Sequence, residues 1–412
     1  MTAISELDLP MLNIEDPGLA EDPAPFIESA RQRHPWLARC SFGYAVHEYE
    51  AMRDLLMMND EVRTSNDAIV DIMGARGTPW GNFMETMMLA RTGPEHIRLR
   101  SSISMAFAPP AVNRHRPLIR RVISDLLDEW APRGAFDFNE FAAHFPIRVT
   151  CALIGASPES IPAVRASLEA QAISFNLDPS LTPTLHAAYR QLWEFVDDLI
   201  VRRQQRGGPM GEQLLDVMIS ARDSGKISDQ ELHDVLIVLF AAGFDTTRNT
   251  LTMVVRLLIQ FPEVWARCAD DWEYCVRAVN EAMRYHGPSN VYRTVAKDLV
   301  YRGVFLPAGT QLFFTNAMSG RDPKAFPDPD RYCPEREGKN RHMAFGRGAH
   351  ICLGRYLATA EIEEGMHLIA QRIVRPLLTA KVSWRPFPGS WGIITLPIEF
   401  EAGPKRPMRA AT

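Results

Sequence analysis

A single cysteine stands inside a glycine-rich run toward the carboxyl end of the chain. The run reads Phe345-Gly346-Arg347-Gly348-Ala349-His350-Ile351-Cys352-Leu353-Gly354. Its glycines permit positive φ and close backbone approach. Cys352 is expected at the start of a helix, where free N–H groups and the helix dipole favour a thiolate. The run therefore predicts one axial bond to a large planar metal cofactor; a glycine turn with a buried cysteine is the plainer alternative.

The other cysteines show no such context. None of them forms a C-x-x-C pair or has the spacing of a zinc cage. Too few are present for a disulfide framework in a chain of this length. We expect them to be buried free thiols: Cys40, Cys151, Cys268, Cys275 and Cys333.

Residue by residue, the glycine-rich run resembles the haem-binding loop of the cytochrome P450 superfamily, F-G-x-G-x-H-x-C-x-G, at every specified position. The resemblance implies haem b with Cys352 as the axial ligand. It places Phe345, Gly346, His350 and Gly354 in the cofactor site. In this superfamily the thiolate favours O–O cleavage. The implied activity is that of a monooxygenase that activates O₂ and oxidises a small apolar molecule.

A second motif, Ala242-Gly243-Phe244-Asp245-Thr246-Thr247, resembles the superfamily's A/G-G-x-D/E-T-T. Gly in mid-helix costs ~1 kcal/mol relative to Ala, which suggests a local reason for it. Ala242 and Gly243 would leave room for a diatomic ligand. Thr246 would turn its hydroxyl into that room, and Asp245 would relay protons. Taken alone, the hexapeptide also fits a helix N-cap or a surface Asp-Thr pair.

Two further matches concern charged residues. Glu281 and Arg284 share a helical face at i, i+3 and resemble the superfamily's E-x-x-R, which forms a buried network with a downstream arginine. Arg336 is the better match for that arginine and Arg331 is the alternative. The network would fix the cysteine loop, since losing one partner leaves an uncompensated buried charge. Alone, the pair would be interpreted as a solvated surface pair.

The propionates of haem require cationic partners. His96 and Arg100 lie at i, i+4 and resemble the H-x-x-x-R that binds propionates in the superfamily. Arg293 and His350 match the other usual contacts. The alternative for His96 and Arg100 is an ordinary surface helix.

The resemblance covers about residues 16–401 and has two departures. Gly320 stands where the pattern usually has Asn, and Cys333 stands where an acidic residue is common. Both lie in the proline-rich stretch, so they bear on the choice between Arg336 and Arg331.

The elements that must position these groups are mostly helical. A capping box at Ser228 opens a long apolar periodicity to about Gln260. Further helices are expected over 272–285 and from about Leu353. Strand signals at 304–306 and 311–315 flank a turn and predict a hairpin; another strand pair is expected within 381–400. The expected fold is mainly α with small β-sheets, near 293–315 and 381–400.

Composition and length exclude several classes of protein and give a first estimate of the number of domains. The chain has 412 residues, is 46% hydrophobic and 23% charged, and carries a formal net charge of −5. These values argue against disorder and against a globally basic nucleic-acid binder. No apolar run reaches the ~20 residues of a membrane span, and no secretory signal is evident, so a cytoplasmic protein is expected. Length alone suggests roughly two or three domains. One haem contacted by His96, Asp245 and Cys352 would instead require a single domain over 1–412. The protein is expected to be a monomer.

The substrate pocket is expected to draw on 80–89, Phe175 and Leu177, Leu239 and Ala242, 289–291 and 391–394. Because no flavin or reductase segment is evident, electrons are expected from an external ferredoxin and its reductase. A patch of arginines would meet that acidic partner: Arg98, Arg114, Arg116, Arg347 and Arg355. A peroxide-using or isomerase-type haem-thiolate enzyme and a non-catalytic haem sensor remain as alternatives.

Overall fold

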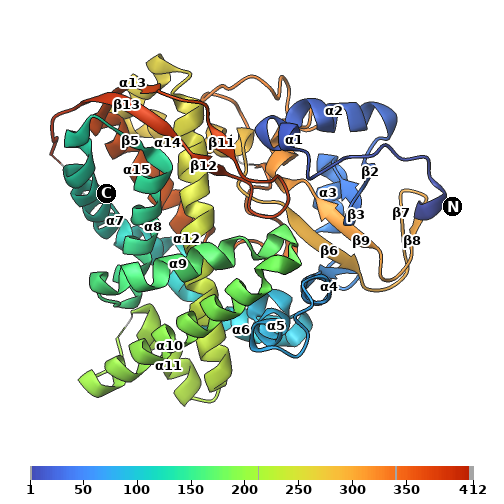
Figure 1. The fold of residues 1–412 in the computed structure, drawn as a ribbon, viewed down its shortest axis with the longest axis horizontal. Coiled ribbons are helices and arrows are strands. Elements are labelled where there is room, and N and C mark those ends of the chain that lie inside the picture. The colour runs from blue at the N-terminus through green and yellow to red at the C-terminus, as the bar shows by residue number, and fades with distance from the viewer. Residues whose placement is uncertain (1, 212, 339–340, 408–412) are drawn as a thin grey trace.

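The computed structural model describes residues 2–211, 213–338 and 341–407. Helices dominate this part of the chain (Figure 1). In chain order they are α1 (Pro17–Glu21), α2 (Pro23–Arg33), α3 (Tyr49–Leu55), α4 (Asn66–Ile72), α5 (Pro79–Thr86), α6 (Gly93–Ile103), α7 (Pro109–Trp130), α8 (Phe138–Ile154), α9 (Ile161–Ala172), α10 (Thr182–Arg206), α11 (Leu214–Asp223), α12 (Asp229–Leu258), α13 (Pro262–Asp270), α14 (Trp272–Tyr285) and α15 (Arg355–Arg372). The expectation of a mainly α fold with small sheets is confirmed.

The strands of the described residues form small separate sheets. The largest has the order β2 (Leu37–Cys40), β3 (Gly43–Val46), β9 (Gln311–Phe314), β6 (Val291–Val295), β4 (Val62–Thr64). A second has the order β1 (Thr2–Ala3), β8 (Val304–Leu306), β7 (Leu299–Tyr301), and a third the order β10 (Ile373–Leu378), β13 (Pro397–Ala402), β5 (Ala135–Asp137). The smallest pairs β11 (Ser383–Trp384) with β12 (Ile393–Thr395).

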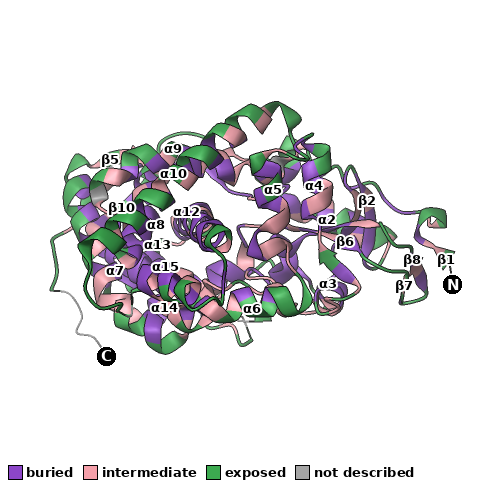
Figure 2. Cartoon of the chain, turned by 90° about the horizontal axis from the view of Figure 1, so that it is seen from below, coloured by how far each residue is buried: buried purple, intermediate pink, exposed green. Residues whose placement is uncertain are grey.

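The central element is α12. Its predicted capping box is present, because the Ser228 hydroxyl accepts from the Glu231 N–H at 3.1 Å and the Glu231 carboxylate accepts from the Ser228 N–H at 2.8 Å. At 1.5 Å per residue the helix is about 45 Å long. Figure 2 looks nearly along it and shows a largely buried rod among other helices. The predicted long helix is confirmed, and it runs through the middle of the fold.

The flanking helices also follow their sequence signals. The helix predicted over 272–285 is α14, and its N-cap Asp271 accepts from the Tyr274 N–H at 2.9 Å. The helix expected from about Leu353 is α15, which begins at Arg355 with Gly354 as its N-cap. Cys352 therefore lies just before the helix instead of in its first turn.

The predicted hairpin is wrong, although both of its strands exist. β8 pairs with β7 and β1, whereas β9 pairs with β6 and β3. After the turn, Val295 of β6 is hydrogen-bonded to Gly309 and Thr310, so the chain enters another sheet. Alternation along a strand reports a buried face but does not specify the partner strand. The pair expected within 381–400 is confirmed as β11 and β12.

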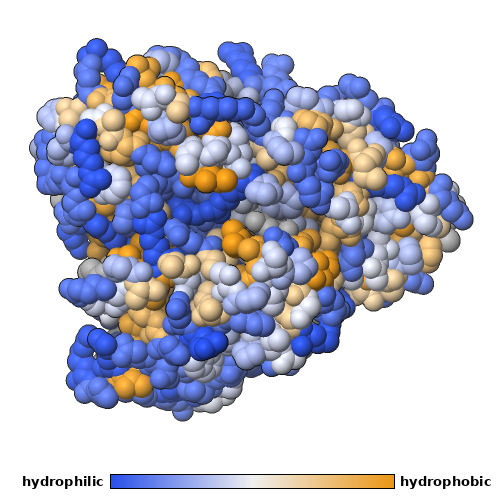
Figure 3. Space-filling view, viewed as in Figure 1, coloured by the Kyte–Doolittle hydropathy of each residue, from blue (hydrophilic) through white to orange (hydrophobic). Residues whose placement is uncertain are grey.

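Apolar side chains form two clusters. The larger surrounds α12 and draws residues from the amino-terminal helices to β13, while the smaller lies at the β1–β8–β7 sheet and the adjoining part of the large sheet. On the face in Figure 3, hydrophobic side chains gather near the middle of the molecule. Among the described residues, no helix is both long and apolar enough to cross a membrane.

Candidate active site

The cysteine loop owes its shape to two glycines. Gly346 and Gly348 have φ of +70° and +73°, a region that non-glycine residues rarely adopt. A Cβ at Gly348 would also lie 2.1 Å from the carbonyl oxygen of Leu56. The Cys352 N–H donates to the Phe345 carbonyl at 2.8 Å and closes the loop. Local chain geometry thus fixes the cysteine without help from a regular helix.

The Cys352 thiol occupies an unusual environment. Its side chain is accessible, yet surrounding protein desolvates it and raises its pKa; the Gly354 N–H and the charges of Arg100 and Arg355 act in the opposite direction. Cys352 itself is absent from the described lining of both cavities next to it, whereas its neighbours His350 and Ile351 each line one of them. A coordinated metal cation deprotonates a thiol outright, so this cysteine suits a metal-bound thiolate better than a free nucleophile.

An internal cavity of about 290 Å³ lies beside α12. Ala242, Asp245 and Thr246 of α12 line it, together with Arg293 of β6 and His350 of the cysteine loop. Ala242 is exposed although most of α12 is buried, because it faces this space. The structure thus brings α12 and the cysteine loop to one cavity.

Gly243, unlike Ala242, does not face the cavity beside α12. It is absent from the lining among the described residues, and a Cβ there would make ordinary contact with Thr150 Oγ1 of α8 at 3.5 Å. Phe345 and Gly346 instead line a second cavity of about 320 Å³ behind the loop. The space expected beside Ala242-Gly243 is therefore provided at Ala242.

The acid–alcohol pair of α12 is held in two different ways. The Thr246 hydroxyl donates to the Ala242 carbonyl at 2.7 Å, which leaves its lone pairs available on the cavity side. The buried Asp245 carboxylate accepts from Arg248 at 2.6 Å, from Arg385 at 2.8 and 2.9 Å, and from Asn249 at 3.2 Å. Arg385 follows β11 and was not anticipated from the sequence, since nothing local marks it as a partner of a residue 140 positions earlier.

Basic groups gather at the cysteine loop; Arg293 and His350 line the cavity, and His96 and Arg100 contact the loop from α6. The His96 and His350 rings lie 4.3 Å apart, and Arg100 donates to the Ile351 carbonyl at 2.6 Å. Arg293 donates to the Tyr292 carbonyl at 2.8 Å.

Within 2–211, 213–338 and 341–407, no carboxylate forms an ion pair with His96, Arg100, Arg293 or His350. Burial lowers the pKa of Arg293 to about 10, and burial together with the Arg293 charge lowers that of His350 to about 3. His350 Nδ1 is buried and has no hydrogen-bond partner within the described residues. A basic cluster of this kind fits a dianionic group, so the accessible Cys352 thiol, the cavity and this cluster together fit haem b.

Glu281 and Arg284 form a fully buried network. Arg284 donates to both carboxylate oxygens of Glu281 at 2.9 Å, and Arg336 donates to the same carboxylate at 2.9 Å. The Cys333 N–H adds a bond at 3.0 Å. Arg331 contributes its backbone carbonyl and not its guanidinium. The side chain that pairs with Glu281 is therefore that of Arg336.

The two departures from the superfamily pattern have local explanations. A Cβ at Gly320 would lie 2.0 Å from the carbonyl oxygen of Arg284, so only glycine fits against this helix end. Cys333 acts through its N–H, which any residue except proline supplies. Neither departure removes a contact from the network.

The cavity lining differs in part from the sequence expectation. Expected members that do line it are Phe83, Met84, Met87, Leu89, Phe175, Ala242, Ser289, Asn290 and Val291. Trp80 and Trp391 are instead fully buried and bonded to Gln171 and the Ala20 carbonyl. Residues that no sequence signal indicated include Thr64, Asn66, Gln171, Ser174 and Tyr292.

The expected arginine patch is smaller than the sequence suggested. Arg98 pairs with Glu231 at 2.5 Å, and Arg116 pairs with Glu363 and Glu364. Arg347 and Arg355 remain beside the cysteine loop, where both line the second cavity with the exposed Tyr356.

A Cytochrome P450 family model matches residues 166–375. The luteothin monooxygenase of Streptomyces thioluteus is 29% identical over 97% of this chain and 98% of its own. A putative cytochrome P450 140 of Mycobacterium tuberculosis is 30% identical over 97% of this chain and 94% of its own. The crystal structure of CalO2 has a TM-score of 0.86 at 24% identity and covers 96% of this chain and 100% of its own.

These matches and the site agree. The protein is a haem-thiolate monooxygenase whose cofactor is haem b. The chain belongs to the cytochrome P450 superfamily.

Proposed function

We propose that this monooxygenase oxidises a small apolar organic molecule with electrons from an external ferredoxin and its reductase. We further propose that it acts in the cytoplasm as a monomer with one domain over 1–412. The observation that carries the proposal is the single cavity bounded by Ala242, Thr246, Arg293 and His350.

Each candidate residue has one role in this proposal. When bound, haem supplies the electron-transfer and oxygen chemistry. Cys352 would supply the thiolate ligand, while His96, Arg100, Arg293 and His350 would neutralise the propionates. The remaining loop residues, Phe345, Gly346 and Gly354, shape the cradle.

Thr246 and Asp245, which line the cavity from α12, are proposed to bind and transfer protons. The Thr246 hydroxyl, which donates to Ala242, would accept a hydrogen bond on the cavity side, and Asp245 would pass protons inward from the side of Arg385. Arg385 is the half-buried end of the Asp245 cluster, so it marks the direction from which solvent reaches the carboxylate.

Two variants test these roles in the purified holoenzyme. Cys352→His should replace the thiolate absorption band of the reduced, carbon-monoxide-bound protein with one typical of histidine ligation. Thr246→Ala should keep the thiolate band but divert electrons to hydrogen peroxide, with product per electron falling about a hundredfold, the low end for losing one proton-transfer group. Unchanged coupling in Thr246→Ala would overturn the role of Thr246.

The proposed partner surface is the pair Arg347 and Arg355 with Tyr356. Arg347→Ala should weaken ferredoxin binding and flatten its dependence on salt. Arg98→Ala is the matched control, because Glu231 already neutralises that arginine. Equal effects of both variants would argue against this surface.

One observation favours a peroxide-using enzyme as a second candidate. Asp245 is fully engaged by Arg248, Arg385 and Asn249, which opposes rapid proton delivery. Turnover with hydrogen peroxide that matches the reductase-driven rate would favour this candidate.

A further inference from the structure

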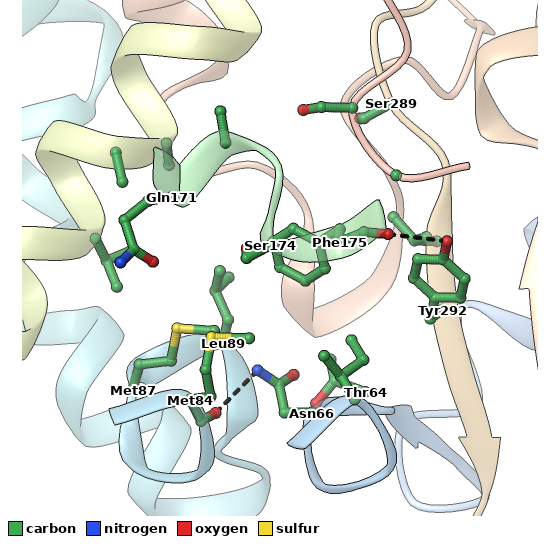
Figure 4. A pocket seen from close by; sticks show the side chains of 18 of the residues that line it. Thr64, Asn66, Met84, Met87, Leu89, Gln171, Ser174, Phe175, Ser289 and Tyr292 are labelled. Atoms are coloured by element: carbon green, nitrogen blue, oxygen red, sulfur yellow. Dashed lines mark hydrogen bonds between the residues drawn. The ribbon is translucent and has the colours of Figure 1, made fainter. Parts of the chain in front are cut away.

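The cavity beside α12 has two unlike walls. In Figure 4, Met84, Met87 and Leu89 lie on one side, and Thr64 and Tyr292 lie on the other. Methionine and leucine form an adaptable apolar surface. The opposite wall carries hydroxyl and amide groups, and its chemistry depends on which of them the protein already uses.

Most polar groups of the lining are already bonded within the protein. Gln171 accepts from Trp80 at 3.1 Å and donates to the Leu185 carbonyl at 3.2 Å. The Tyr292 hydroxyl donates to the Phe175 carbonyl at 3.2 Å (Figure 4). These groups shape the cavity and have little capacity left for a ligand.

Asn66 and Ser174 are two of the exceptions, and they are the two that are nearly fully buried; the hydroxyls of Thr64, Ser289 and Ser390 also have no hydrogen bond within the described residues. The Asn66 amide donates to the Met84 carbonyl at 3.0 Å; because a carbonyl only accepts, this bond identifies the NH₂ group and leaves Oδ1 as a free acceptor. Figure 4 shows Oδ1 turned away from Met84. The Ser174 hydroxyl has no partner within the described residues. The two residues are only 7% and 2% exposed.

No charged side chain of the described lining is available to a ligand at Asn66 and Ser174. Asp245 is neutralised by Arg248 and Arg385, and Arg293 and His350 belong to the haem side. Once the haem propionates pair with Arg293, a charged ligand would find no free counter-charge among the described lining residues. Buried polar groups without partners are costly, so the cavity favours a neutral ligand that can bond to them.

We propose that the substrate is a neutral, compact molecule with an apolar body and a hydroxyl or N–H group that donates to Asn66 Oδ1 and bonds to the Ser174 hydroxyl. This inference rests on the proposed function and narrows its substrate class. A plain hydrocarbon of the same size leaves both groups unpaired, so it binds more weakly than the matching alcohol.

Matched probe pairs test this in the holoenzyme by optical titration of the haem spin state. The pairs are adamantane and 1-adamantanol, decalin and 2-decalol, and cyclododecane and cyclododecanol. At least one alcohol should bind about threefold to tenfold tighter than its hydrocarbon, the net value of one hydrogen bond. Ser174→Ala and Asn66→Leu should each reduce this preference.

Two controls keep the outcomes distinct. Asn66→Leu also removes the hydrogen bond to the Met84 carbonyl and could change the cavity shape. Ser174→Ala removes no hydrogen bond within the described residues, so its effect on the preference reports the ligand contact alone. Ser65→Ala should keep the preference, because the Ser65 hydroxyl is already bonded to Thr294 at 2.9 Å. Equal binding of alcohol and hydrocarbon in every pair, an unchanged preference in both variants, or no spin shift with any probe would overturn the inference. Loss of the thiolate band in the parent protein would instead overturn the proposed function.

Discussion

Among single residues, Asp234 on α12 is notable because burial disfavours the charged form of its carboxyl group. It accepts from Gln230 at 2.9 Å and from Thr86 at 3.2 Å, yet desolvation outweighs these bonds and raises its pKa to about 6. The folded protein therefore holds this proton at pH values where the unfolded chain has lost it. Stability from this residue is present below about pH 4 and declines as pH rises through about 6.

Asp234→Asn should raise the free energy of unfolding at pH 7. The amide keeps the hydrogen-bonding capacity and removes the buried charge, a gain on the order of 3 kcal/mol for a shift of about two pKa units. Denaturant unfolding of both proteins between pH 4 and 8 measures it. The curves should converge near pH 4 and separate as pH rises; parallel curves would contradict the assignment.

Among elements, α14 and the proline-rich stretch are joined by one carboxylate. Glu281 accepts from Arg284, Arg336 and the Cys333 N–H, and the Glu281–Arg284 pair has no exposed side-chain surface. Removing the single negative charge leaves two cations without compensation. Because the same stretch leads into the cysteine loop, the effect extends to haem retention.

Glu281→Gln should cost about 3–5 kcal/mol of unfolding free energy, as expected for breaking a buried ion pair. It should also lower the haem-to-protein ratio after purification. Glu335→Gln is the matched control, since Glu335 is exposed and lies 3.6 Å from Arg267. A full haem complement and unchanged stability in Glu281→Gln would refute a structural role.

The elements also show what sequence can and cannot predict. The capping box at Ser228 and the apolar periodicity predicted α12, because both signals are local. The pairing of β8 and the contact between Asp245 and Arg385 depend on residues far apart in the chain. Asn66 and Ser174 carry no motif, and their free hydrogen-bonding capacity is visible only once their neighbours are known. Motifs proposed to hold the cofactor could therefore be recognised in the sequence, whereas the residues proposed to contact the substrate could not.

For the whole molecule, the proposed cofactor site draws on segments from α6 to the loop before α15. His96 comes from α6, Ala242 from α12 and Cys352 from that loop. The proposal of one domain rests on this spread, because separate domains could not each keep part of the proposed site. The two apolar clusters meet in the large sheet, since β9 contributes Phe313 to one and Phe314 to the other.

Denaturant unfolding should therefore remove haem absorbance and helical circular dichroism in one coincident transition. Coincidence of independent probes is the usual sign of cooperative unfolding. Tryptophan fluorescence gives a third probe, with Trp36 in the smaller cluster and Trp80 in the larger. Clearly separated midpoints would show that the chain contains more than one folding unit.

The basic cluster around His350 also bears on how the protein matures in a cell. Arg100 and Arg293 carry positive charge beside the neutral His350, and neither has a carboxylate partner among the described residues. A ligand that binds only the folded state stabilises it by mass action, and an anionic cofactor also pairs with these arginines. Newly made chains should therefore depend on haem supply to escape degradation, and iron limitation should lower the amount of this protein before it lowers the activity of each molecule.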